Sequence, residues 1–148
     1  MIRADVTEKI LTQKRLKRLS WKTLAAEIGG GSPVYITAAL MGQMKLRPEQ
    51  AERAAALLGL NQEEMLLLQE VPYRGALATV LPTDPLIYRF YEIMQVYGTT
   101  VKELVQEEFG DGIMSAIDFD LSVERQPDPK GDRVKVTMSG KFLNYKEY

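Results

Sequence analysis

The stretch DPLIYRFYEIMQVYG, residues 84–98, decides how the second half of the chain folds. Asp84 is a favourable N-cap residue, Pro85 suits the first helical position, and Gly98 is a residue type that commonly ends helices. The apolar residues between them recur every three or four positions, as on one face of a helix: Ile87, Phe90, Tyr91, Met94 and Tyr97. The sequence therefore predicts an amphipathic helix that begins after Asp84 and ends at Gly98.

Arg89 and Glu92 stand three positions apart on this predicted helix, so their side chains leave from neighbouring positions. A guanidinium flanked by Tyr88, Phe90 and Tyr91 is a candidate for binding a small anion, because it stays charged at any working pH. A solvated surface pair is the competing interpretation, since exposed pairs at this spacing are common and contribute only about 0.2–0.5 kcal/mol. The spacing alone leaves both interpretations open.

The composition is that of an ordinary globular protein, with 45% hydrophobic and 26% charged residues. A chain of 148 residues can bury a core as one domain or as two small ones. No apolar run is long enough to cross a bilayer, and the first ten residues, MIRADVTEKI, lack a signal-peptide core. We therefore expect a cytoplasmic protein that does not bind membranes.

The sequence contains no cysteine and no histidine. This excludes disulfides, thiolate nucleophiles, serine–histidine triads and histidine-ligated metal sites. An enzyme with this inventory has to work with Arg, Lys, Asp, Glu, Ser, Thr or Tyr, which suits the binding and polarisation of small anions. We expect neither a metal nor a cofactor.

The first 75 residues predict a bundle of five short helices. The expected spans are 6–19, 21–28, 33 to about 41, one that begins at Pro48, and one that follows Asn61 and ends before Pro72. Asn61 and Glu64 form a capping box, and Gly42 ends the third helix. The compact pair made by the second and third helices resembles the helix-turn-helix domain of phage-type repressors.

The sequence of the third predicted helix argues against recognition of DNA bases. Its sequence, SPVYITAALMGQ at residues 32–43, has no Arg, Lys, Asn or Gln before Gln43, and base edges are read by such side chains. The helix is apolar nearly all round, which predicts burial. The basic cluster from Lys14 to Lys22 could contact phosphates, although a solvated helix face is the commoner explanation. We interpret this domain as a packing and assembly module that binds no nucleic acid.

The balance of basic and acidic side chains changes near the middle of the chain. Residues 1–75 carry 11 basic and 8 acidic side chains, whereas residues 76–148 carry 8 basic and 12 acidic ones. An irregular stretch with prolines and a glycine separates the two halves. We expect a helical domain over 1–75, a linker over 76–83 and a second domain over 84–148.

The second domain predicts a further helix and then strands. Thr100 and Glu103 form a capping box for a helix to about Phe109. From there the apolar period changes to two, and one strand face would carry Ile113, Ser115, Ile117, Phe119, Leu121 and Val123. Residues 133–138 alternate as a second strand, and residues 141–145 are a candidate third strand after a break at Ser139-Gly140.

The fold class that these signals predict is α+β. Two helices and two or three strands make a thin core for so short a domain, and its apolar strand face needs cover. We therefore expect the second halves of two copies to interlock as an intertwined dimer.

Ser115 places a hydroxyl in the middle of the predicted apolar strand face. The commoner interpretation of such a residue is a hydroxyl that is hydrogen-bonded to a backbone carbonyl. The functional interpretation is a hydroxyl kept in an apolar pocket for an anionic ligand. The residue alone does not decide between them.

The segments DPLIYRFYEIMQVYGTT (84–100) and FGDGIMSAI (109–117) resemble the signature of the cyanase, or cyanate hydratase, family. VYITAALMGQ (34–43) and LLLQEVP (66–72) resemble that family's N-terminal domain, so the resemblance covers nearly the whole chain. In that family the Arg and Glu of an R-F-Y-E element and the Ser of a G-D-G-I-x-S element are catalytic. The resemblance therefore implies the catalytic set Arg89, Glu92 and Ser115.

The resemblance also implies a reaction and an assembly. Cyanate and bicarbonate would give carbamate and carbon dioxide, and carbamate would decay to ammonia and more carbon dioxide. The family implies a homodecamer, a pentamer of dimers, with sites shared between subunits. Other members carry a cysteine in the linker region where this chain has Ala76, so a thiol is not essential here.

Two other function classes compete with this one. A DNA-binding repressor with a C-terminal oligomerisation domain is the runner-up, and the missing base-reading side chains count against it. A purely structural assembly protein is the third class, and Ser115 together with the Arg89/Glu92 pair counts against that. Ammonia release from cyanate, with and without bicarbonate, would separate all three.

Overall fold

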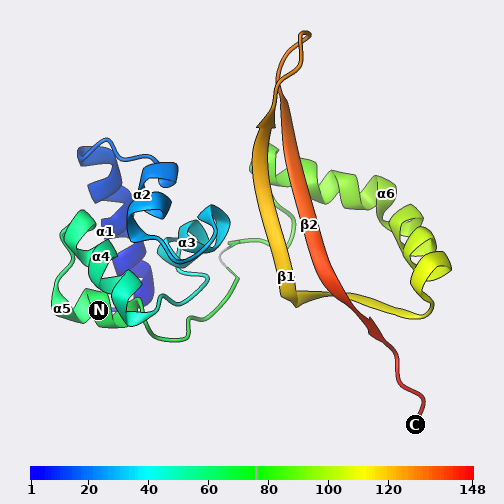
Figure 1. The fold of residues 1–148 in the computed structure, drawn as a ribbon, viewed down its shortest axis with the longest axis horizontal. Coiled ribbons are helices and arrows are strands. Elements are labelled where there is room, and N and C mark those ends of the chain that lie inside the picture. Colours follow the sequence, from blue (N-terminus) through cyan, green and yellow to red (C-terminus); the bar gives the residue numbers. More distant parts are fainter. Residues whose placement is uncertain (76) are drawn as a thin grey trace. The chain divides into compact units, whose positions relative to one another are not determined.

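The computed structural model describes residues 1–75 and 77–148, and the predicted linker position Ala76 lies outside the described residues. The chain divides into two compact units, one up to residue 76 and one from Leu77 to Tyr148. Figure 1 shows helices α1–α5 in the first unit and α6, β1 and β2 in the second, which is an α+β composition. In the part of the chain described, no helix combines the length and the hydropathy needed to span a membrane.

The first unit has the five helices that the sequence predicts. They are α1 (Arg3–Leu16), α2 (Trp21–Ile28), α3 (Pro33–Leu40), α4 (Pro48–Leu58) and α5 (Gln62–Leu67). Only α1 differs much from its expected span, because it begins and ends three residues earlier. Asp5 accepts a hydrogen bond from the Ile2 amide at 2.8 Å, which fixes the early start. Arg18 adopts a left-handed conformation with φ 53°, which prevents the helix from reaching Leu19.

The core of this unit is built from aliphatic side chains that α1–α4 and their flanking loops bury completely: Val6, Ile10, Leu24, Ile28, Ile36, Leu40, Leu58 and Leu68. Burying one such side chain contributes about 1.5–3 kcal/mol. α3 buries Ile36 and Leu40 but leaves Tyr35 39% exposed. The prediction of all-round burial for this helix is therefore wrong, and only one of its faces is buried.

The second unit opens with α6 (Pro85–Phe109), a single helix of 25 residues. The Asp84 carboxylate accepts hydrogen bonds from two amides of the first turn, which confirms the predicted N-cap. The predicted stop at Gly98 and the predicted second helix after Thr100 are wrong, because α6 continues to Gly110, where φ is 90°. A glycine inside a helix costs about 1 kcal/mol relative to alanine, which weakens a helix without ending it.

The sheet of the second unit is one antiparallel hairpin of β1 (Gly112–Gln126) and β2 (Arg133–Asn144). The candidate third strand over 141–145 is wrong, since those residues up to Asn144 continue β2. Gly140 therefore lies inside a strand and does not break it.

The pairing register shifts near the start of β1. Residues 112–114 pair with 142–144, and residues 119–126 pair with 133–140, so residues 115–118 lie opposite the single residue Lys141. The bulge contains an odd number of extra residues. The side chains on one face of β1 therefore change from even-numbered positions before the bulge to odd-numbered positions after it.

The shift decides which side chains share a face of the hairpin. Met114 lies on the same face as Phe119, Leu121 and Val123, whereas Ile113 lies on the opposite face. The predicted single face that runs without interruption from Ile113 to Val123 is therefore wrong. Across the bulge, period-two reasoning fails because it assumes one unbroken ladder.

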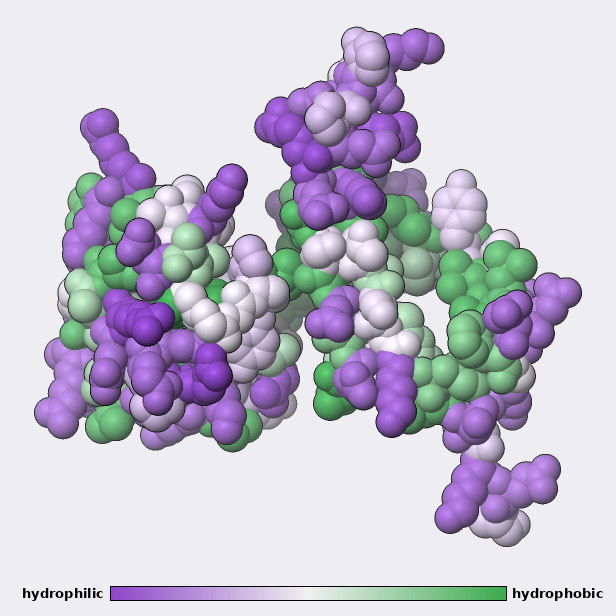
Figure 2. Space-filling view, in the orientation of Figure 1, coloured by the Kyte–Doolittle hydropathy of each residue, from purple (hydrophilic) through white to green (hydrophobic). Residues whose placement is uncertain are grey.

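The second unit leaves much of its apolar surface uncovered. α6 has no buried residue, and on the hairpin Ile117, Val123 and Val134 are 95%, 60% and 72% exposed. Hydrophobic residues accordingly reach the surface over α6 and the hairpin in Figure 2. The two meet at the C-terminal end of α6, where the rings of Phe109 and Phe142 lie 5.1 Å apart.

Candidate active site

Arg89 and Glu92 lie on the first half of α6 and form an ion pair. Arg89 Nη1 donates to Glu92 Oε2 at 2.8 Å, and the guanidinium carbon lies 5.7 Å from the centroid of the Tyr88 ring. The two side chains are 60% and 49% exposed. Because Glu92 engages only one nitrogen and the Arg89 side chain is largely exposed, the remaining guanidinium donors can take further acceptors.

Ser115 lies in the bulge of β1 and is only 6% exposed. Its Oγ accepts hydrogen bonds from the Ile117 and Asp118 amides, both at 3.0 Å. The backbone carbonyl of the commoner interpretation is not its partner, because backbone amides donate to the oxygen instead. The hydroxyl proton has no acceptor among the described residues, so it remains available for a ligand.

The structure brings two of the three candidate residues together. No hydrogen bond or ion pair among the described residues joins Arg89 or Glu92 to Ser115. Two cavities of about 260 and 250 Å³ lie between α6 and the hairpin, and Val105 and Met114 line both of them. Neither cavity is lined by a candidate residue.

These residue types have the chemistry to bind small anions. Arg89 offers fixed cationic donors, Ser115 offers a hydroxyl, and Glu92 can orient the guanidinium. Within the residues that the structure describes, no three His, Cys, Asp or Glu side chains gather where they could hold a metal ion.

Sequence reasoning missed one residue that lies against Ser115. A Cβ at Gly140 would overlap the carbonyl oxygen of Ser115 and lie 2.6 Å from Met114 Cγ. The available signal was a glycine inside an alternating strand pattern, which is typical of a bulge or of a close approach of two backbones. The turn signal at Ser139-Gly140 instead predicts a break between strands, which the structure does not have.

Comparison with known proteins gives one consistent result along the chain. Residues 3–72 match the family described as Cyanate hydratase, N-terminal, and residues 79–147 match the Cyanate lyase C-terminal domain. The chain belongs to the cyanate hydratase family. This membership confirms the resemblance seen in the R-F-Y-E and G-D-G-I-x-S elements, and it makes the chain an enzyme of the lyase class.

Individual members of the cyanate hydratase family match over their full length. The cyanate hydratase of Ralstonia pickettii (strain 12J) is 60% identical and that of Albidiferax ferrireducens is 57% identical, each over 148 residues and 100% of both chains. The crystal structure of cyanase from T. urticae is 35% identical with a TM-score of 0.81, and the match covers 94% of this chain and 96% of that one. The fold is therefore cyanase-like.

Proposed function

We propose that the chain catalyses the bicarbonate-dependent decomposition of cyanate to ammonia and carbon dioxide through carbamate, with Arg89, Glu92 and Ser115 as its catalytic residues. The observation that carries the proposal is the 2.8 Å Arg89–Glu92 pair, in a chain that is 60% identical to a cyanate hydratase. The repressor alternative loses its support, because α3 offers no base-reading side chain and the family match extends through that half.

Arg89 would offset the repulsion between the two substrates. Cyanate and bicarbonate are both anions, and two unit charges about 4 Å apart repel by about 4 kcal/mol near a protein surface. A guanidinium fork can contact both anions through separate nitrogens, whereas an ammonium is a single point of charge.

Glu92 and Ser115 would complete the site in different ways. The hydrogen bond from Arg89 to Glu92 supports an orienting role for the carboxylate, and participation in proton movement is the alternative. The two amide hydrogen bonds that Ser115 Oγ accepts support its role as a donor, because they leave its own proton to point at an anion.

The proposed reaction balances without a metal or a covalent enzyme intermediate. An oxygen of bicarbonate bonds to the cyanate carbon, and the bond from that oxygen to the bicarbonate carbon breaks to release carbon dioxide. The nitrogen takes the bicarbonate proton and one proton from solvent, which gives carbamate. One more proton then releases ammonia and a second carbon dioxide. Holding both reactants together can supply several kcal/mol of the barrier.

We further propose that the working enzyme is an intertwined dimer within a homodecamer, a pentamer of dimers, in the cytoplasm. The exposed apolar residues of α6 and the hairpin support this, because a helix that is apolar on several faces is normally covered. In the proposed organisation residues 1–75 form the helical domain, 76–83 the linker and 84–148 the catalytic and dimerisation domain.

The test is ammonia release from cyanate by the full chain, in buffer freed of carbon dioxide and then with bicarbonate added back. We expect turnover only when bicarbonate is present. A rate that does not respond to bicarbonate would contradict the proposed chemistry, and no ammonia in either condition would contradict the function itself.

A further inference from the structure

Gly140 of β2 lies where the bulge of β1 comes closest to its partner strand. It pairs with Phe119, the first residue after the bulge. A Cβ at this position would overlap the Ser115 carbonyl oxygen and crowd Met114 Cγ at 2.6 Å. The first of these atoms belongs to the backbone, so a rotamer change cannot relieve the overlap.

The glycine is needed here for space and not for its backbone freedom. Gly140 is absent from the glycines with positive φ, and it keeps the extended conformation of β2. Any residue can adopt that conformation. What only glycine provides is room for a second backbone.

The close approach is linked to the geometry of the Ser115 hydroxyl. Four residues, 115–118, are folded opposite one residue of β2, and this compact turn brings the Ile117 and Asp118 amides within 3.0 Å of Ser115 Oγ. Two donors on one oxygen leave little freedom in where the hydroxyl proton points. A bulge pushed away from β2 would loosen both hydrogen bonds.

We propose that Gly140 is a positioning residue, whose missing side chain lets the bulge close against β2 and so fixes the Ser115 hydroxyl. The inference rests on the proposed role of Ser115 in the reaction. Gly140 touches no substrate and acts only through the backbone of its neighbour. A displacement of about 1 Å at a reacting group lowers turnover by about 10²-fold, so a modest shift of the bulge should be measurable.

The variant that tests this is Gly140→Ala, with Gly112→Ala as the matched control. A Cβ at Gly112 would also overlap a backbone carbonyl of the same hairpin, that of Leu143, and its nearest neighbours, Leu143 and Phe142, lie outside residues 115–118. We expect both variants to lose thermal stability, while only Gly140→Ala loses at least about tenfold in kcat. An unchanged kcat in Gly140→Ala, or an equal loss in Gly112→Ala, would overturn the proposal.

A double-mutant cycle separates positioning from general damage. If Gly140 acts through Ser115, adding Gly140→Ala to Ser115→Ala should not lower the residual turnover further. The same fold-loss in both backgrounds would show an independent, merely structural effect and overturn the proposal. Should Gly140→Ala not fold, the comparison is made in a Met114→Ala background, which removes the Met114 Cγ contact and keeps the overlap with the Ser115 carbonyl.

Hydrogen exchange gives a readout that does not depend on activity. We expect a peptide covering residues 115–119 to exchange faster in Gly140→Ala than in the wild type, because the amides of Ile117 and Asp118 lose their acceptor. Unchanged exchange there would overturn the positioning role. If the wild-type chain itself released no ammonia from cyanate, the proposed function would fail while this measurement still decided the role of Gly140.

Discussion

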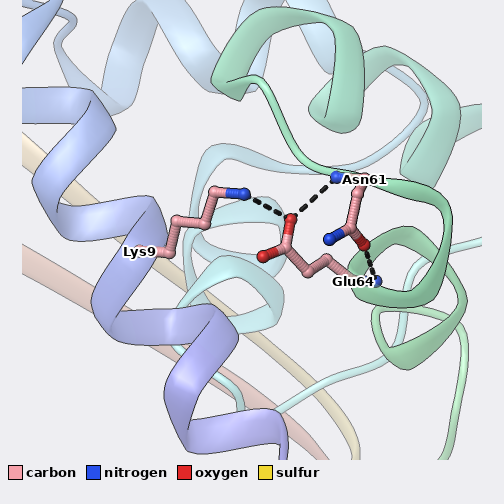
Figure 3. A network of polar contacts seen from close by, with 3 residues as sticks. All are labelled: Lys9, Asn61 and Glu64. Atoms are coloured by element: carbon pink, nitrogen blue, oxygen red, sulfur yellow. Dashed lines mark hydrogen bonds and ion pairs between the residues drawn. The ribbon is translucent and has the colours of Figure 1, made fainter. Parts of the chain in front are cut away.

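Glu64 of α5 and Lys9 of α1, 55 positions apart in the sequence, form a partly buried ion pair in the first unit, with Nζ 2.6 Å from Oε2. Figure 3 shows how the same carboxylate oxygen also accepts the Asn61 amide at 2.7 Å, while the Asn61 side chain accepts the Glu64 amide at 2.9 Å. The capping box predicted from the sequence is therefore confirmed. It also ties the last helix of the unit to the first, which no local pattern predicted.

We expect this pair to make the first unit sensitive to acid. The hydrogen bond from Lys9 lowers the pKa of the Glu64 carboxyl below its usual value near 4.5. Because the folded state binds this proton less readily than the unfolded state does, the stabilisation is present above that usual value. It is lost as the pH falls through the lower folded pKa.

The test is Glu64→Gln, with the exposed neighbour Glu63→Gln as the control. Replacing the charge should lower the free energy of unfolding by about 2 kcal/mol at neutral pH, since hydrogen bonds to a charged group are lost. It should also flatten the decline in stability as the pH falls from neutral to below the usual glutamate pKa near 4.5. Urea unfolding of the full chain across this range checks both effects. An equal loss in Glu63→Gln would assign the effect to net charge and not to the pair.

Arg89→Lys should abolish most turnover although the positive charge is kept. A lysine offers one charged point and cannot reproduce the fork that would contact both anions, so we expect kcat to fall by about 10²-fold or more. Arg125→Lys is the matched control, because Arg125 Nη1 pairs with Asp132 Oδ2 at the same 2.8 Å elsewhere in the second unit. Steady-state ammonia release from both variants gives the comparison. Near-full turnover of Arg89→Lys would withdraw the assignment.

Activity should survive chelators and thiol reagents. The chain has no cysteine for a thiol reagent to modify and no histidine to ligate a metal. Ammonia release is therefore measured before and after dialysis against a chelator, and again after treatment with a thiol reagent. Loss of turnover on dialysis that zinc restores would count against the metal-free mechanism.

The sequence predicted most of the first unit because its signals are local. Ser20 and Ser32 accept the amides of Thr23 and Tyr35 as N-caps, at 2.9 and 3.1 Å. An N-cap acts within one helical turn, so three or four residues are enough to recognise it. The contact between Arg89 and Glu92 could be predicted for the same reason, since helical spacing alone places the two side chains next to each other.

The errors lie where the outcome depends on distant residues. Gly98 is a residue type that commonly ends helices, yet α6 continues through it and ends at Gly110. The bulge at residues 115–118 depends on the pairing of β1 with β2, in which Gly140 has to leave room. Neither an apolar period nor a turn signal contains that information, because both describe a single stretch of chain.

The last prediction concerns a site shared between subunits. Ser115 is joined to neither Arg89 nor Glu92 within the described chain, and no residue of α6 is buried. If a neighbouring chain completes the site, Arg89→Ala and Ser115→Ala should each be severely impaired alone but regain turnover when refolded together. A fraction of the sites in each mixed particle would then hold every catalytic group intact.

Sedimentation of the wild-type chain supplies the independent measurement, and we expect a particle much larger than one chain. A monomer that releases ammonia from cyanate at the full rate would show that the site needs no neighbour, and both the proposed assembly and the shared site would be wrong.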